Sequence, residues 1–235
     1  MALQTANYLS GRIENIIFYK SRGKYFARSM PVNVKQTMAT KTRSSNFGIA
    51  SAAGSTLRGL LMPVLPFPKD RNMQNRFSGA IAKWLARSNV NDLQPEYNLP
   101  YVQDFNFNAQ TSIAERWKIA IAVTQTADGG IAVHIPAFVP ANDIIAPAHT
   151  TVVLCTVVAA WCRLKDGTAA GNFALTMEMP YNQDVINEQT LSFPVVTSNG
   201  HLVITAASFR YVLAGGKPNE NISFIPSSVI DVRYC

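Results

Sequence analysis

The chain has 235 residues, 48% of them hydrophobic and only 15% charged, so it is long enough for one large domain or two small ones with a real core. Its net charge of +7 is unevenly spread, because residues 1–90 carry 14 Lys/Arg and 2 Asp/Glu while residues 91–235 carry 7 and 12. This distribution indicates an N-terminal segment that contacts something acidic: nucleic acid, a membrane surface or the acidic half of a second copy.

Cysteine content and apolar runs argue against two further classes of protein. Cys155, Cys162 and Cys235 are an odd set, which does not suggest a disulfide framework. The longest apolar run, Thr150 to Cys162, is too short and too β-branched to span a membrane. The opening residues lack a secretory signal, so we expect synthesis in the cytoplasm, with later incorporation into a virion or filament left open.

The stretch from Gly11 to Pro31 predicts one β-hairpin with apolar residues on both faces. Ser21-Arg22-Gly23 supplies the turn, because Gly23 is free to take a positive φ. Along the first arm, one face carries Ile13, Asn15, Ile17 and Tyr19, and the other carries Glu14, Ile16 and Phe18. A lone hairpin is marginal in water, so it needs a partner surface in this chain or another. The residues expected to make contacts between copies are Ile13, Ile16, Ile17, Phe18, Tyr19, Tyr25 and Phe26.

A connector and a first helix are expected next. Residues 32–45 are basic, rich in Thr and Ser and without period, which predicts an extended arm. A 3.6-residue period then predicts a helix over 46–65, capped by Ser44 or Ser45. Its three glycines each cost about 1 kcal/mol relative to alanine, which indicates either close packing against another backbone or a frayed helix. The apolar positions are Phe47, Ala50, Ala53, Leu57, Leu60 and Leu61, and the glycines are Gly48, Gly54 and Gly59.

A second helix is predicted from about Asp70 to Arg87, after a proline-rich break. Its apolar stripe consists of Met73, Phe77, Ala80, Ile81, Trp84 and Leu85. Three basic residues share another face, which is either solvated or in contact with an acidic surface. The residues proposed to contact an acidic partner or nucleic acid are Arg22, Lys24, Arg28, Lys35, Lys41, Arg43, Arg76, Lys83 and Arg87.

A polar linker over residues 88–115 separates these elements from the rest. Its aromatic residues are expected to pin the loop onto a domain surface; they are Tyr97, Tyr101, Phe105 and Phe107. The charge changes sign here, which predicts a domain boundary near residue 110 and therefore two domains, 1–110 and 111–235.

From Arg116 onward a period of two residues predicts about seven strands separated by turn signals. The expected strands cover 116–124, 131–135, 150–164, 172–179, 190–196, 201–213 and 227–234. This pattern is typical of an antiparallel β-sandwich of immunoglobulin-like size, without the Cys…Trp…Cys spacing of antibody domains. The predicted fold class is therefore α+β, with an N-terminal β-hairpin and two helices followed by the sandwich.

The N-terminal stretch resembles the opening of an uncharacterised family of small bacterial proteins, mainly over residues 11–60. The shared residues are Gly11, Ile13, Ile17, Tyr19, Gly23 and the block Arg28-Ser29-x-Pro31. Members of that family begin with a Gly-rich hairpin ending in Arg-Ser-x-Pro, followed by a polar connector, a helix and a β-rich C-terminal half. Glu14 departs from the glycine that the family tends to have there. The resemblance implies an architecture and no activity.

No constellation in the sequence predicts catalysis or metal binding. His134, His149 and His201 have no second ligand at i+2 or i+4, so each is expected at a surface or sheet edge. The motifs G-x-S-x-G, H-E-x-x-H, C-x-x-C and G-x-x-x-x-G-K are missing. We therefore expect no enzyme, no cofactor, no metal site and no small-molecule substrate.

Two functional hypotheses follow. The first is a structural protein that self-associates head to tail, in which the hairpin and basic arm of one copy add to an exposed sheet edge of another, as in a virion, tail or filament subunit. The alternative is a nucleic-acid-binding protein, because the basic N-terminal residues are interleaved with Tyr19, Tyr25 and Phe26.

Overall fold

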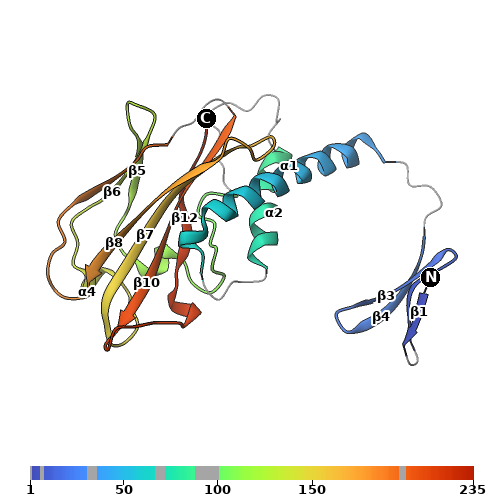
Figure 1. Ribbon diagram of the computed structural model, residues 1–235, viewed down its shortest axis with the longest axis horizontal. Coiled ribbons are helices and arrows are strands. Elements are labelled where there is room, and N and C mark those ends of the chain that lie inside the picture. The colour runs from blue at the N-terminus through green and yellow to red at the C-terminus, as the bar shows by residue number, and fades with distance from the viewer. Residues whose placement is uncertain (1, 6–7, 31–35, 67–71, 88–100, 196–199) are drawn as a thin grey trace. The chain divides into compact units, whose positions relative to one another are not determined.

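The protein has a mixed α+β fold of antiparallel sheets and helices, as the alternating and helical periods of its sequence predict (Figure 1). The computed structural model describes residues 2–5, 8–30, 36–66, 72–87, 101–195 and 200–235, without the side chains of 2–5 and Arg87. The chain divides into two compact units, Met1–Thr42 and Arg43–Cys235. Pro31, Lys35 and Tyr97, which the sequence analysis singled out, lie outside the described residues.

The first unit contains a four-stranded antiparallel sheet in the order β1-β2-β3-β4. Its strands are β1 (Ala2–Thr5), β2 (Tyr8–Ile13), β3 (Ile16–Ser21) and β4 (Lys24–Ser29). The predicted hairpin is confirmed as β3 and β4, joined by Arg22 and Gly23, both at positive φ. The prediction of one continuous first arm is wrong, because Glu14, at φ +46°, makes an additional turn. Ile13 therefore belongs to β2 and pairs with Ile16 instead of sharing its strand.

Two helices follow, α1 (Met38–Leu60) and α2 (Met73–Arg87). The extended arm predicted up to Ser45 is wrong from Met38 onward, so Lys41 and Arg43 are helical. The helix is capped earlier than expected, because Thr37 Oγ1 accepts a hydrogen bond from the backbone N–H of Thr40 at 3.2 Å. A short 3₁₀ turn, η1 (Met62–Val64), follows α1 and precedes α2.

The described residues of the second unit form two further antiparallel sheets. The larger has the order β11-β10-β7-β8, with β12 also paired to β10. It comprises β7 (Thr150–Arg163), β8 (Gly171–Pro180), β10 (His201–Leu213), β11 (Lys217–Pro218) and β12 (Ser227–Tyr234). The smaller sheet comprises β5 (Ala122–Gln125), β6 (Ile131–Ile135) and β9 (Gln189–Phe193). Short helical segments are α3 (Ile113–Arg116), α4 (Pro140–Asp143) and η2 (Ile222–Phe224).

The strands expected from Thr150 onward are confirmed, whereas the one expected from Arg116 begins only at Ala122. Arg116 instead ends α3, which starts at a reciprocal capping box of Ser112 and Glu115. Residues 117–121 are irregular apart from an isolated bridge between Trp117 and Ile144.

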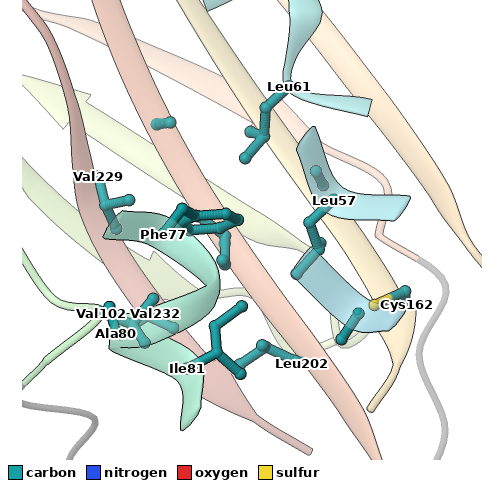
Figure 2. Close-up of a cluster of buried hydrophobic side chains, with 14 of the residues drawn as sticks. Leu57, Leu61, Phe77, Ala80, Ile81, Val102, Cys162, Leu202, Val229 and Val232 are labelled. Atoms are coloured by element: carbon teal, nitrogen blue, oxygen red, sulfur yellow. The ribbon is translucent and has the colours of Figure 1, made fainter. Parts of the chain in front are cut away.

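Two hydrophobic cores lie on opposite faces of the larger sheet. In one, α1 and α2 cover the sheet; Figure 2 shows Leu57 of α1 and Ile81 of α2 over Leu202 of β10. In the other, β6 and β9 pack their apolar side chains against the odd-numbered residues of β7 and β10. Cys162 lies in the first core and Cys155 in the second, so the prediction that they cannot pair is confirmed.

This arrangement corrects the predicted domain boundary near residue 110. The helices share their core with β7, β10 and β12, so the described part of 43–110 belongs with the C-terminal strands. The loop that was expected to separate two domains instead packs against both α2 and β12. Phe105 and Phe107 place their rings 5.2 and 5.4 Å from that of Phe77 on α2, and Phe107 N–H donates to Ser227 O.

The packing of α1 explains one of its three glycines. A Cβ at Gly54 would lie 2.9 Å from Ser78 Oγ of α2, so this glycine allows the two helices to approach closely. Gly48 and Gly59 face open space, and the expectation of close packing is wrong for them. Phe47 was expected in the buried stripe but is 61% exposed, because the helix bears on the core only from about Ala50.

Candidate assembly surface

The sheet of the first unit has no buried side chain among residues 8–30 and 36–42. Its large apolar residues are instead between 40% and 50% exposed. They are Tyr8, Ile13, Ile16, Tyr19, Tyr25 and Phe26, and all but Tyr8 were predicted as contact residues. The other two predicted residues, Ile17 and Phe18, are partly buried. The described side chains of the unit therefore present apolar surface and form no buried core among themselves.

Aromatic rings and cations meet on both faces of this sheet. On one face Tyr19 lies opposite Phe26, with ring centroids 5.6 Å apart, and the guanidinium of Arg28 lies 5.8 Å from the Tyr19 ring. On the other face Tyr25 stacks on Tyr8 at 3.8 Å, and Lys20 Nζ lies 5.1 Å from the Tyr25 ring. Each face thus carries a pair of rings with a cation beside it, a combination that favours contact with flat or acidic groups.

The charge of the first unit is strongly positive. Residues 1–42 contain seven Lys/Arg and one acidic residue, Glu14, whereas 13 of the 14 acidic residues lie in 43–235. Arg22 lies in the exposed turn between β3 and β4, and Lys24 is the first residue of β4 and also exposed; their contact with an acidic partner stays a prediction. Lys41 is also exposed, on α1.

The predicted basic residues of the second unit play different roles. Arg43 and Lys83 are exposed. Arg76 instead donates from Nη1 to Asn106 O at 2.9 Å and from Nη2 to Phe107 O at 3.2 Å, with its guanidinium 5.3 Å from the Phe105 ring. It holds the loop onto α2 and also lines an open cleft, so its contact with a partner stays a prediction. The side chain of Arg87 lies outside the described residues.

The larger sheet of the second unit ends at β8, a strand of ten residues. One side of β8 pairs with β7, and no strand among the described residues pairs with the other side. Along it, Asn172, Ala174, Thr176 and Glu178 are exposed, and Phe173 is 42% exposed. The sequence predicted the strand but not its position at the edge, because strand order depends on long-range pairing.

Two clefts open on the second unit. The first, of about 350 Å³, is mostly apolar, with Asp104 as its one acidic lining residue. The second, of about 480 Å³, is lined by Arg76 and Lys83 of α2 together with Tyr101 and Phe105. Neither cleft brings a histidine or a cysteine beside a carboxylate.

The described part of the chain fixes the surroundings of two histidines and two buried cysteines. No group of three or more His, Cys, Asp or Glu residues there is placed to hold a metal ion. His134 lies on β6 between the hydroxyls of Thr124 and Thr190, at 3.2 and 2.9 Å. His201 is only 3% exposed and contacts Ala169 O at 3.1 Å, so the expectation that it lies at a surface is wrong. Burial raises the pKa of the Cys155 and Cys162 thiols to about 12.

Comparison of the chain with protein-family models, curated proteins and solved structures finds no match. Among the described helices, none has both the length and the apolar character that crossing a bilayer requires.

Proposed function

We propose that this protein is a non-enzymatic structural subunit that self-associates head to tail, with the first unit (Met1–Thr42) of one copy bound to the second unit (Arg43–Cys235) of another. The observation that carries this proposal is the exposed apolar sheet of the first unit. A small sheet becomes stable by burying at least one face, and this one buries neither by itself. A surface on another molecule supplies the missing cover.

Charge favours another copy as that molecule. The first unit has a net charge of +6. The second unit has +1 in all, but its residues 91–235, which include β8, have −5. Opposite charges increase the rate of association and orient the two surfaces as they meet. A contact between two different surfaces of the same chain closes into a ring or continues as a filament. A virion, tail or filament subunit made in the cytoplasm fits this geometry, without a cofactor or small-molecule substrate.

We also propose that the second unit is a β-sandwich of immunoglobulin-like size. The support is its second core, in which Val133 and Phe193 of the smaller sheet share one cluster with Cys155 and Phe209 of the larger. The resemblance of residues 11–60 to the uncharacterised bacterial family stays a prediction of architecture.

The test compares oligomeric mass with and without the exposed rings of the first unit. The double variant Tyr25→Ser, Phe26→Ser is expected to lower the mass measured by light scattering at a fixed concentration. Phe47→Ser, which removes a more exposed ring from the second unit, is the matched control and should leave the mass unchanged. Deletion of residues 1–31 should likewise leave a soluble protein that no longer oligomerises. Equal masses for the wild-type, doubly substituted and truncated chains would refute the proposal.

A second candidate function is binding of single-stranded nucleic acid by the first unit. The observation that favours it is the pairing of Arg28 with Tyr19 and of Lys20 with Tyr25, since cations neutralise phosphates while aromatic rings stack on bases. Binding of a generic DNA fragment should then weaken steeply as salt is raised. If DNA binds at low salt while Tyr25→Ser, Phe26→Ser leaves the oligomeric mass unchanged, this candidate replaces self-association.

A further inference from the structure

We propose that β4 of one copy pairs edge to edge with β8 of the next, so that the small sheet of the first unit extends the larger sheet of the second. This inference rests on the proposed self-association and names the two strands that make the contact. Both are terminal strands of their sheets.

Both strands have an edge available for pairing. All six residues of β4 are exposed, and the outer side of β8 has no strand partner among the described residues. A free edge presents unpaired N–H and C=O groups, which readily accept another strand. Natural edges are commonly protected by lysine or proline, yet β8 contains no lysine and has proline only at its last residue, Pro180. The start of β8 is held against α1, because Asn172 Nδ2 donates a hydrogen bond to Leu60 O. The part of the strand edge that is available for pairing therefore begins at Phe173.

The side chains of β8 divide into an apolar face and a polar face. Phe173, Leu175 and Met177 pair with odd-numbered residues of β7 and lie on the side of the core that contains β6 and β9. Thr176 and Glu178 lie on the opposite side and are exposed. A strand that pairs with β8 must likewise place apolar side chains on the first face and polar side chains on the second.

Strand β4 has a matching division. Tyr25 and Ala27 lie on one face, and Lys24 and Arg28 lie with Phe26 on the other, because side chains alternate along a strand. When Tyr25 and Ala27 continue the apolar layer of β8, both cations fall on the face that carries Glu178. The two strands therefore match in pattern and in charge.

The same charges disfavour the competing pairing of β4 with itself. Two β4 strands side by side would bring Lys24 and Arg28 of one copy near those of the other, and like charges on neighbouring strands repel. Pairing with β8 replaces this repulsion by attraction to Glu178. The preference makes the contact heterologous, as head-to-tail association requires.

The first experiment places a positive charge on β8 in the full-length chain. Glu178→Lys is expected to raise the concentration at which half of the protein is associated by about tenfold or more, because the attraction becomes repulsion. Ala174→Lys adds a positive charge to the same edge and the same face without removing an acid, and it should also weaken association. Glu220→Lys makes the same charge change at an exposed position beyond β11 and should shift that concentration less than about twofold. Circular dichroism checks that each variant is folded.

Exchanging the charges of β4 and β8 then distinguishes direct pairing of the two strands from a general effect of charge on association. Lys24→Glu together with Arg28→Glu should weaken association alone and restore it when combined with Glu178→Lys in the same chain. Restoration supports direct pairing, whereas loss without restoration counts against it. If Tyr25→Ser, Phe26→Ser abolishes association while Ala174→Lys and Glu178→Lys do not weaken it, the first unit still mediates assembly but β8 is not its acceptor. If none of these variants changes the mass, association through the first unit is refuted.

Discussion

Replacing Gly54 with alanine measures how closely α1 approaches α2. Alanine in a helix interior is more favourable than glycine by about 1 kcal/mol. At Gly48, where an added Cβ meets nothing, most of this gain should appear as a higher free energy of unfolding. At Gly54 the new Cβ would lie 2.9 Å from Ser78 Oγ, which forces the hydroxyl or the helix to move. Overpacking of this kind costs about 1–3 kcal/mol, so Gly54→Ala should be neutral or destabilising.

The clash can be separated from the helical preference by removing the hydroxyl. In a Ser78→Ala background the remaining contacts of the new Cβ, with Ser78 Cα and Ile81 Cδ1, are at an ordinary 3.6 Å. Gly54→Ala should then stabilise the protein by about 1 kcal/mol, as Gly48→Ala does. Urea unfolding followed by circular dichroism gives the free energies of unfolding of the wild-type chain, the three single variants and the double variant. If Gly54→Ala stabilises as much as Gly48→Ala with Ser78 present, the close contact between α1 and α2 is wrong.

Three further predictions concern the second unit. Phe77→Ala should lower the free energy of unfolding by about 3–5 kcal/mol in urea, because its ring is fully buried against Phe105 and Phe107; a loss below about 1 kcal/mol would contradict that packing. A thiol reagent should modify only one cysteine of the native protein and all three in denaturant, since Cys155 and Cys162 are buried and free. Stability should fall as pH rises from the ordinary thiol pKa of 9.0 towards about 12, because the unfolded chain loses those protons first; a stability independent of pH over this range would be inconsistent with buried thiols.

The strands of the second unit were predictable because local signals coincide there. Strands β10 and β12 begin and end at the predicted residues. Glycine-containing turns at Gly200 and at Gly215 and Gly216 bound β10, and Pro226 precedes β12. The stripe of α2 was equally clear, and all six of its predicted residues are buried. Where a segment buries one continuous face, period and structure agree.

The start of α1 was not predictable from apolar period. Residues 38–48 bury no side chain, so they have no pattern for a periodicity argument to detect. The available signal was Thr37, which caps the helix, but Ser44 and Ser45 offered competing caps. The extra turn at Glu14 was missed for a similar reason, because glutamate is not a typical residue for positive φ.

The residues of the candidate assembly surface could be predicted from the sequence, but the strand proposed to bind them could not. Apolar side chains on both faces of a hairpin can be read from the sequence, and the structure shows most of them exposed. The edge position of β8 depends on pairings between strands far apart in the chain. Arg76 appeared as one of three cations on a helix face, and only its hydrogen bonds to Asn106 O and Phe107 O distinguish it from Lys83.

The central strands β7 and β10 have apolar residues on both faces, and this bears on how the chain selects its alignment. A slip of one residue would exchange the side chains that face the helices with those that face the smaller sheet. Neither set is polar enough to oppose the exchange, so side-chain volume and the strand ends must select the correct alignment. Hydrogen bonds from Leu164 N to Gly200 O and from Ala214 N to His149 O, both at 2.8 Å, fasten the two ends of the β7–β10 pair. Deleting one residue beside either of these hydrogen bonds would therefore shift the alignment of β7 and β10. We expect such a variant to form a misaligned sheet and not merely to fray at the strand ends.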